Sequence, residues 1–152
     1  MPADQPGRDM RFCLMNWIAI VNQLSVTRAN RQLDAGPLPF AQFVMLLHFS
    51  AQADRQHSVT EVANAFQQPQ PGTTKTIRKL EEKGFLHGQA HPTDGRVKLF
   101  SITPGGQQAV SRAADELMPL LTWLFDGWDD AGLARMYQDL DRLKVRLDTN
   151  RG

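Results

Sequence analysis

The chain has 152 residues, a net charge of +1 and one cysteine. This length supports one hydrophobic core of ordinary size. The small net charge argues against a protein that coats nucleic acid, and one cysteine excludes an intramolecular disulfide. Charge is unevenly distributed, because residues 58–112 hold seven Lys/Arg against four Asp/Glu, whereas residues 113–152 hold five against eight. The middle of the chain is therefore the segment suited to an anionic partner.

The first predicted element is a long helix over residues 9–33. It is apolar on nearly every face, through Phe12, Leu14, Met15, Trp17, Ile18, Ile20, Val21 and Leu24. Such a helix needs apolar cover all round, and in so short a chain a second copy is the expected cover. The apolar run is too short to span a bilayer. We expect neither a signal peptide nor a membrane segment, and a reducing, cytoplasmic location.

A second helix is predicted over residues 39–52, after the break at Gly36-Pro37. Two shorter helices follow. Ser58 and Glu61 have the S-x-x-E spacing of a capping box, which predicts a helix start at Ser58. The next helix is predicted over residues 71–83. Three of its residues, spaced at i, i+4 and i+7, are expected to face the core: Thr73, Ile77 and Leu80. Its outward face carries cations and hydroxyl groups, which suit phosphates and base edges.

Two strands are predicted over residues 85–91 and 96–103, joined by a turn at residues 92–95. Arg96 follows this turn directly, and an arginine at the tip of a hairpin can enter the narrow minor groove of DNA. Asp94 is expected to hold the Arg96 guanidinium by a charge-assisted hydrogen bond.

The remainder is predicted to be two helices, the first running from about residue 107 to Phe125, with Asp129 or Asp130 capping the second. The first is expected to turn six residues inward: Ala109, Ala113, Leu117, Leu120, Leu121 and Leu124. The second has the 3-4-3-4 spacing of a coiled-coil seam, at Leu133, Met136, Leu140, Leu143 and Leu147. The alternative to a seam between two chains is a helix packed on its own chain.

These motifs, between Ser58 and Gly106, resemble the winged helix-turn-helix of the multiple-antibiotic-resistance regulator (MarR) family. The matching elements are S-x-x-E-V-A, T-K-x-I-x-K-L-E-x-K-G-F, the D-x-R wing and the I-T-x-x-G exit. Gly95 departs from the pattern, because many members carry a second arginine there. The resemblance implies a mainly α fold with a small β-hairpin wing. It also implies a dimerisation helix over residues 1–35, a DNA-binding domain over 36–106 and dimerisation helices over 107–152.

The resemblance also implies a homodimeric bacterial transcription regulator. The helix predicted over residues 71–83 and the hairpin after it, together called the reader, contact DNA, and the two readers of the dimer lie about one helical turn (~34 Å) apart on a pseudo-palindromic site. The residues predicted to contact DNA are Pro71, Gly72, Thr74, Lys75, Thr76, Arg78, Lys79, Asp94, Arg96 and Lys98. Of these, Lys75 and Thr74 or Thr76 are assigned to base edges, and Arg78, Lys79 and Lys98 mainly to phosphates.

Two means of switching are considered. In proteins of this kind an inducer often binds between the dimer helices and the reader, where the candidate lining is Trp17, Phe43, Met45, His48 and Phe49. The alternative is that these residues are ordinary core. Cys13, beside Arg11, resembles the reactive cysteine of the peroxide-sensing branch, since a nearby cation and a helix N-terminus favour the thiolate. That branch uses nearby tyrosines, however, and Tyr137 is the one tyrosine here.

Other classes of function are less well supported by the sequence. Histidines 48, 57, 87 and 91 form no tight cluster with cysteine, so we expect no metal and no cofactor. The chain has no Gly-rich phosphate loop and no H-E-x-x-H motif, so we expect no enzyme. The remaining alternative is a winged helix used for protein–protein contact, which needs no basic wing and no basic helix face.

Overall fold

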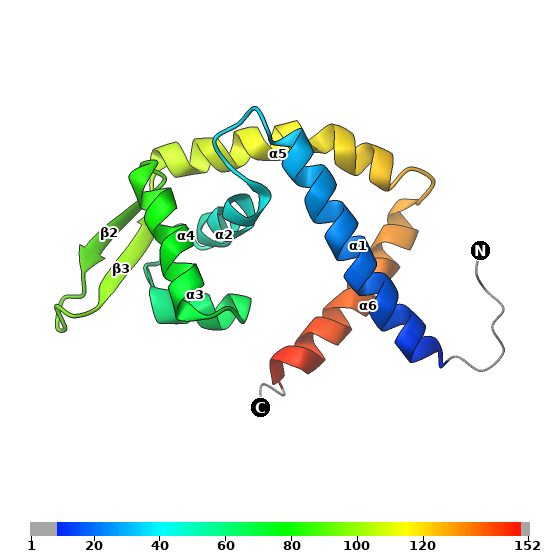
Figure 1. Ribbon diagram of the computed structural model, residues 1–152, viewed down its shortest axis with the longest axis horizontal. Helices are drawn as coiled ribbons and strands as arrows, with labels where there is room; N and C mark the ends of the chain where they lie inside the picture. The colour runs from blue at the N-terminus through cyan, green and yellow to red at the C-terminus, as the bar shows by residue number, and fades with distance from the viewer. Residues whose placement is uncertain (1–8, 150–152) are drawn as a thin grey trace. The chain divides into compact units, whose positions relative to one another are not determined.

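The computed structural model describes residues 9–149, which form helices and one small antiparallel sheet (Figure 1). In chain order the elements are α1 (Met10–Gln32), α2 (Phe40–Ala51), β1 (His57–Ser58), α3 (Val59–Phe66), α4 (Gln70–Glu82), β2 (Leu86–Ala90), β3 (Lys98–Ile102), α5 (Pro104–Leu124) and α6 (Asp130–Thr149). The predicted fold class is confirmed. The chain divides into two units inside α5, one ending at Met118 and the other beginning at Pro119.

The sheet has a third strand that the sequence did not predict. Its strand order is β1-β3-β2, and His57 of β1 pairs with Phe100 of β3. Two residues are too few to show the alternation that identifies a strand. The predicted pair is confirmed as β2 and β3, in a register that places Gly88 opposite Phe100 and Ala90 opposite Lys98. This hairpin extends from the helices of its unit as a wing (Figure 1).

The helix-turn-helix forms from local signals. The Ser58 hydroxyl accepts from the Glu61 N–H at 3.2 Å, and the Glu61 carboxylate accepts from the Ser58 N–H at 2.8 Å, which confirms the capping box. Gln67 ends α3 in the left-handed region, with φ 50°. The Gln70 side-chain amide then donates to the Thr60 hydroxyl at 3.0 Å, which joins the start of α4 to α3.

A glycine lets the chain turn from the end of α4 toward the wing. Gly84 has φ 76°, its N–H donates to the Glu81 carbonyl at 2.9 Å, and the Phe85 N–H donates to the Leu80 carbonyl at 2.9 Å. These two bonds make a Schellman motif, which favours glycine at this position. The Thr103 hydroxyl, at the end of the wing, donates to the Gly84 carbonyl at 2.6 Å. Both strands of the wing are therefore fastened beside the end of α4.

The core of the first unit centres on the inward face of α4, which packs against α2, α3 and β2. Thr73, Ile77 and Leu80 are all buried, as predicted. Their buried neighbours include Leu46 and Phe49 of α2, Val62 of α3, Leu86 of β2 and Phe100 of β3. The apolar stripe of α4 thus fixes which of its faces remains outside.

The long helices leave apolar side chains uncovered. Of α1 only Ala29 is buried, and α6 has no buried residue within the described part of the chain. In α5 the inward positions Ala109, Ala113 and Leu117 are confirmed, whereas Leu121 was predicted to be inward and is exposed. Leu121 lies beyond Met118, where α5 leaves the core of the first unit. Across residues 9–149, no helix combines the length and apolarity that a membrane span requires.

Lys83, the residue that caps the end of α4, is tied to the loop before α2 and to α2 itself. The Lys83 ammonium donates to the Pro37 carbonyl at 2.5 Å and to Oε1 of Gln42 at 2.6 Å. Burial, and to a smaller extent the charge of Lys79, hold the pKa of Lys83 below its usual range. Hydrogen bonds to a partly desolvated ammonium are stronger than those at an open surface, so this tie helps to set the position of α4.

Two histidines meet where α2 packs against the sheet. The rings of His48 and His57 lie 5.4 Å apart, and Phe49 stands edge-on to His57 at 5.3 Å. His57 is only 3% exposed, and its Nε2 has no hydrogen-bond partner among the described residues. Burial, His48 and Arg55 hold the pKa of His57 below its usual range, against an opposing effect of Glu61. Burial and Arg55 also lower the pKa of His48.

These lowered pKa values predict a loss of stability in mild acid. Because the unfolded chain takes up protons more readily than the folded one, the stabilising effect of neutral histidines is complete above the unfolded pKa of about 6.5. It is lost progressively as pH falls below that value, toward the folded pKa of each ring. Urea unfolding of the wild type and of His57→Phe, followed between pH 7.5 and 5.5, measures this. The wild type is expected to lose more stability over the interval.

His87→Gln is the matched control, because His87 is an exposed histidine on β2. It is expected to keep the pH dependence of the wild type. Equal pH dependence of His57→Phe and the wild type would contradict the assignment.

A second prediction concerns the tie at Lys83. Lys83→Met keeps the length of the side chain but leaves the Pro37 carbonyl and the Gln42 amide oxygen without their donor, which is expected to lower the free energy of unfolding by about 1–2 kcal/mol. Lys79→Met, an exposed position on the same helix, is expected to change it by no more than about 0.5 kcal/mol. Chemical denaturation of both variants makes the comparison, and equal effects would show that the tie contributes nothing.

Candidate nucleic-acid interface

The outward face of α4 is cationic. Lys75, Arg78 and Lys79 are all exposed, on the side of the helix opposite its buried face. Arg78 lies 3.8 Å from the Glu82 carboxylate, one turn along the same helix, and both side chains are well exposed. Such a pair is weak, so it leaves the arginine able to exchange Glu82 for another anion.

The hydroxyl groups of this helix are already engaged. Thr74 donates to the Gln70 carbonyl at 2.8 Å, and Thr76 donates to the Gly72 carbonyl at 3.1 Å. Each hydroxyl hydrogen is therefore used within the helix, while the oxygen lone pairs and the methyl group stay available. Thr74 is exposed and Thr76 is half-buried, so Thr74 is the better placed of the two to accept a hydrogen bond or contact an apolar group.

The N-terminus of α4 is open. Its N-cap is Pro69, and none of the described residues supplies a side-chain cap there. Pro71 lies in the first turn, where its missing N–H leaves no gap in the hydrogen bonding of the helix. Gly72 is exposed, and a Cβ built on it would meet no atom within 4 Å. An extended polymer can therefore approach the backbone closely at this end.

The tip of the wing is organised by His91 and Asp94. The His91 ring Nδ1 accepts from the N–H groups of Thr93 and Asp94 at 3.2 and 3.3 Å. The Asp94 carboxylate accepts from the backbone N–H of Arg96 at 3.1 Å, and not from its guanidinium as was predicted. An aspartate reaches the N–H two residues on more readily than a flexible side-chain end. Asp94 therefore shapes the turn, and Arg96 remains exposed beyond it.

Lys98 is bound within the protein. Its ammonium lies 2.8 and 3.1 Å from the two carboxylate oxygens of Glu81 on α4. It also lies 5.3 Å from the centroid of the Phe100 ring. The charge of Lys98 predicts a phosphate contact, whereas its partner in the structure is Glu81, which the sequence did not predict. The available signal was the alternation of the strand, because Lys98 and the buried Phe100 share a face.

The residues predicted to line an inducer pocket differ widely in their burial. Phe43, Met45 and Phe49 are buried in the core, His48 is half-buried, and Trp17 is 51% exposed on α1. A separate hollow of about 10 Å³ lies between the loop before α2 and α5, and none of these five residues lines it. It has room for about one water molecule, far less than the several hundred Å³ of an ordinary ligand site.

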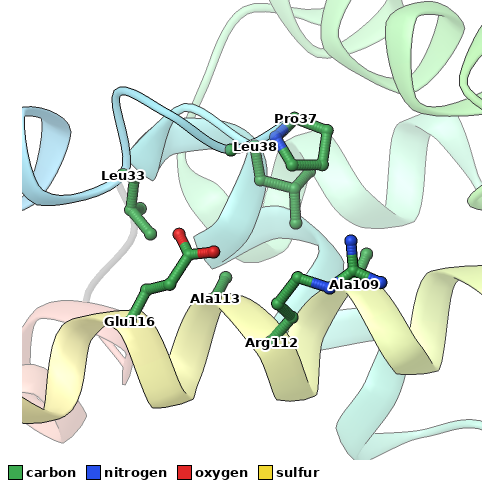
Figure 2. A pocket seen from close by; sticks show the side chains of 8 residues that line it. Leu33, Pro37, Leu38, Ala109, Arg112, Ala113 and Glu116 are labelled. Carbon is green, nitrogen blue, oxygen red and sulfur yellow. The ribbon is translucent and has the colours of Figure 1, made fainter.

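Figure 2 shows how this hollow is bounded. Its lining residues are Leu33, Gly36, Pro37, Leu38, Ala109, Arg112, Ala113 and Glu116. Gly36 faces the Glu116 carboxylate, and a Cβ built on Gly36 would lie 3.1 Å from it. The side chains of Arg112 and Glu116 point in different directions in the view of Figure 2. The small-molecule inducer therefore remains a prediction.

Cys13 is half-buried near the start of α1 and is a free cysteine. Arg11, the cation expected beside its thiol, is held by the Asp9 carboxylate, which also caps the helix. This arrangement gives no particular support to the peroxide-sensing alternative, which stays a prediction. Within residues 9–149, no three His, Cys, Asp or Glu side chains are grouped as a metal site requires.

Comparison with known proteins agrees with this geometry. The sequence model of the MarR family matches residues 37–97, and no curated protein matches the sequence. The transcriptional regulator BldR from Sulfolobus solfataricus is 25% identical, with a TM-score of 0.80 over 91% of this chain and 96% of that one.

Two further similar structures were solved with DNA. At their low sequence identity, the similarity shows that the fold is shared and nothing more. A mutant of Escherichia coli MarR in complex with operator DNA is 21% identical, with a TM-score of 0.73 over 86% of this chain and 92% of that one. The Staphylococcus aureus MepR–DNA complex is 17% identical, with a TM-score of 0.73 over 87% and 96%. Residues 37–97 are thus a winged helix-turn-helix segment of the MarR family, in a chain with the fold of that family's transcription regulators.

Proposed function

We propose that this protein is a sequence-specific regulator of transcription that binds double-stranded DNA as a homodimer. The observation that carries the proposal is the exposed cationic face of α4, beside a wing whose tip exposes Arg96. A helix with these groups suits the major groove, and an arginine on a hairpin suits the adjacent minor groove. BldR, a transcriptional regulator, shares the fold over most of both chains. The MarR and MepR structures, which share the fold and were solved with DNA, support DNA as the partner.

The residues divide into reading and positioning groups. Lys75 and Thr74 contact base edges, where the Thr74 oxygen accepts from a base amino group or its methyl group meets that of thymine. Arg78 and Lys79 contact phosphates, and a phosphate also approaches the open N-terminus of α4 at Pro71 and Gly72. Thr76 stands at the edge of this surface. Asp94 shapes the turn that presents Arg96.

A homodimer explains the apolar surfaces that one chain leaves uncovered. The exposed large side chains of α1 include Phe12, Met15 and Leu24, and those of α6 include Leu140, Leu143 and Leu147. Stable interfaces of this kind bury roughly 2,000 Å² or more. Two copies related by a two-fold axis present two readers, which fits a pseudo-palindromic site.

The regulator acts in the cytoplasm, as a repressor that releases DNA when a small molecule binds. The repressor role is part of the proposal and does not follow from the reader itself, because an activator uses the same kind of reader; a dimer bound across a promoter represses by excluding polymerase. The winged helix as a protein-contact module is the competing function. It gives no reason for cations on both α4 and the wing tip, so loss of DNA binding on removal of those cations separates the two.

A third prediction concerns the reader. Duplexes selected from a random pool by repeated binding are expected to contain a pseudo-palindrome with half-sites about 10 base pairs apart. On the selected duplex, Lys75→Ala is expected to weaken binding by about 1–3 kcal/mol and to relax discrimination at its base pair. Arg96→Ala is expected to weaken binding roughly tenfold and to reduce the dependence on salt by about one ion per reader. Gel-shift titrations at several salt concentrations measure both.

Arg142→Ala on α6 is the control, since it removes an exposed cation outside the reader. It is expected to bind as the wild type does. Unchanged affinity of both Lys75→Ala and Arg96→Ala would refute the assignment of the reader.

A fourth prediction concerns the dimer. The wild type is expected to sediment with twice its chain mass of 17.1 kDa. Leu143→Asp places a charge in the predicted seam of α6 and is expected to shift the protein toward monomer, because a buried unpaired carboxylate is strongly unfavourable. Gln138→Asp adds the same charge on the opposite face of α6 and is expected to remain dimeric. A monomeric wild type, or equal behaviour of the two variants, would argue against this interface.

A further inference from the structure

An ion pair joins the two parts of the reader. Glu81 lies in the last turn of α4, and its two carboxylate oxygens accept from the Lys98 ammonium at 2.8 and 3.1 Å. Lys98 is the first residue of β3. The pair therefore connects the helix proposed to read bases with the strand that leads from the wing tip, and Arg96 is only two residues away from it.

A glycine makes room for this connection. Gly88 lies in the middle of β2, opposite Phe100. A Cβ built on Gly88 would collide with Lys98 Cε, and would lie 2.8 Å from the Phe100 ring and 2.9 Å from Glu81 Oε1. The Lys98 side chain thus crosses β2 where that strand has no side chain. Glycine inside a strand often marks such a close approach.

The Glu81–Lys98 pair lies at the end of the β2–β3 ladder that is nearest the wing tip. Ala90 opposite Lys98 is the final rung of the β2–β3 ladder toward the tip. Beyond it the His91 N–H donates to the Val97 carbonyl, and the further hydrogen bonds described there lie within the turn. The direction of the tip relative to α4 therefore depends on what fixes the end of the ladder, and the Glu81–Lys98 pair lies at that end.

The exposure of the pair shows what it contributes. The side chains are 51% exposed for Lys98 and 33% for Glu81. Ion pairs at this exposure contribute little to stability. An acid on a surface that faces DNA is also unfavourable for binding, because it repels phosphates. Glu81 is thus explained neither by stability nor by charge complementarity, which leaves geometry.

We propose that Glu81 and Lys98, seated over Gly88, are positioning residues that set the wing at a fixed distance and direction from α4, so that one DNA site engages both. This role rests on the proposed function. In this role Lys98 contacts Glu81 within the protein and does not contact a DNA phosphate. It requires that removal of the negative charge of Glu81 weakens DNA binding, whereas electrostatics alone requires that the same change strengthens it.

The experiment compares Glu81→Gln, Lys98→Gln and the double variant on the selected duplex. Glu81→Gln is expected to weaken binding roughly three- to fivefold per reader, the range that an exposed pair can supply. The double variant is expected to bind no more weakly than either single variant, because both remove the same interaction. The dependence on salt is expected to be unchanged in Lys98→Gln, since no phosphate contact is lost.

Glu82→Gln is the matched control. It removes the same charge from the next residue of the same helix turn, where the acid pairs along α4 with Arg78. It is expected to bind DNA as tightly as the wild type or more tightly. Hydrogen exchange of the free protein supplies a readout without DNA: amide exchange at residues 88–98 is expected to rise in Glu81→Gln and to stay unchanged in Glu82→Gln.

Gly88→Ala tests the pair from its other side. Its Cβ displaces Lys98, so the variant is expected to show weaker DNA binding and faster wing exchange while both charges remain. Because a new methyl group in a packed strand also affects folding, its melting temperature is measured alongside, and Glu81→Gln carries the test if Gly88→Ala unfolds.

The outcomes are distinct. If Glu81→Gln binds as tightly as Glu82→Gln, and Lys98→Gln alone reduces the dependence on salt by about one ion per reader, then Lys98 is a phosphate contact and the positioning role is refuted. If the wild type binds no duplex from the random pool, the proposed function fails and the positioning role falls with it.

Discussion

The structure of the reader depends on the burial of one face of α4. Thr73, Ile77 and Leu80 are almost fully enclosed by α2, α3 and the sheet. Since successive residues of a helix are about 100° apart, fixing these three determines the direction of every other side chain on α4. Lys75, Arg78 and Lys79 are outside because Ile77 and Leu80 are inside. The same packing brings the last turn of α4 to the base of the wing.

Much of this fold follows from local sequence, and what did not follow required contacts between distant segments. The Ser58–Glu61 capping box fixes a helix start within a few residues, so the sequence alone predicted it. The glycine after Lys83 fixes the end of α4 in the same local way. Strand β1 depends on its partner β3, and two residues carry no pattern of their own. The burial of Leu121 was wrongly predicted, because this residue keeps the spacing of an inward position after the core of the first unit has ended.

The candidate site shows the same division. The cationic face of α4 follows from helical periodicity, and the exposed Arg96 from the turn before it. The roles of Asp94 and Lys98 were assigned by charge, yet each is decided by what lies nearest. Asp94 accepts from a backbone N–H two residues on, and Lys98 meets a carboxylate from a helix that is 17 residues away in sequence. Charge shows that a side chain seeks a partner, whereas topology decides which partner it reaches.

The last turn of α4 joins the scaffold to both parts of the reader. Lys83, which caps the end of α4, donates to the Pro37 carbonyl in the loop before α2 and to Gln42 in α2. Glu81, two residues earlier, holds Lys98 of the wing. Two adjacent polar ties therefore fix α4 to the core and the wing to α4. Because a helix turn moves as one unit, any displacement of the loop at Pro37 that shifted Lys83 would also shift the wing. Placing both ties on one turn keeps the helix and the wing in register with each other.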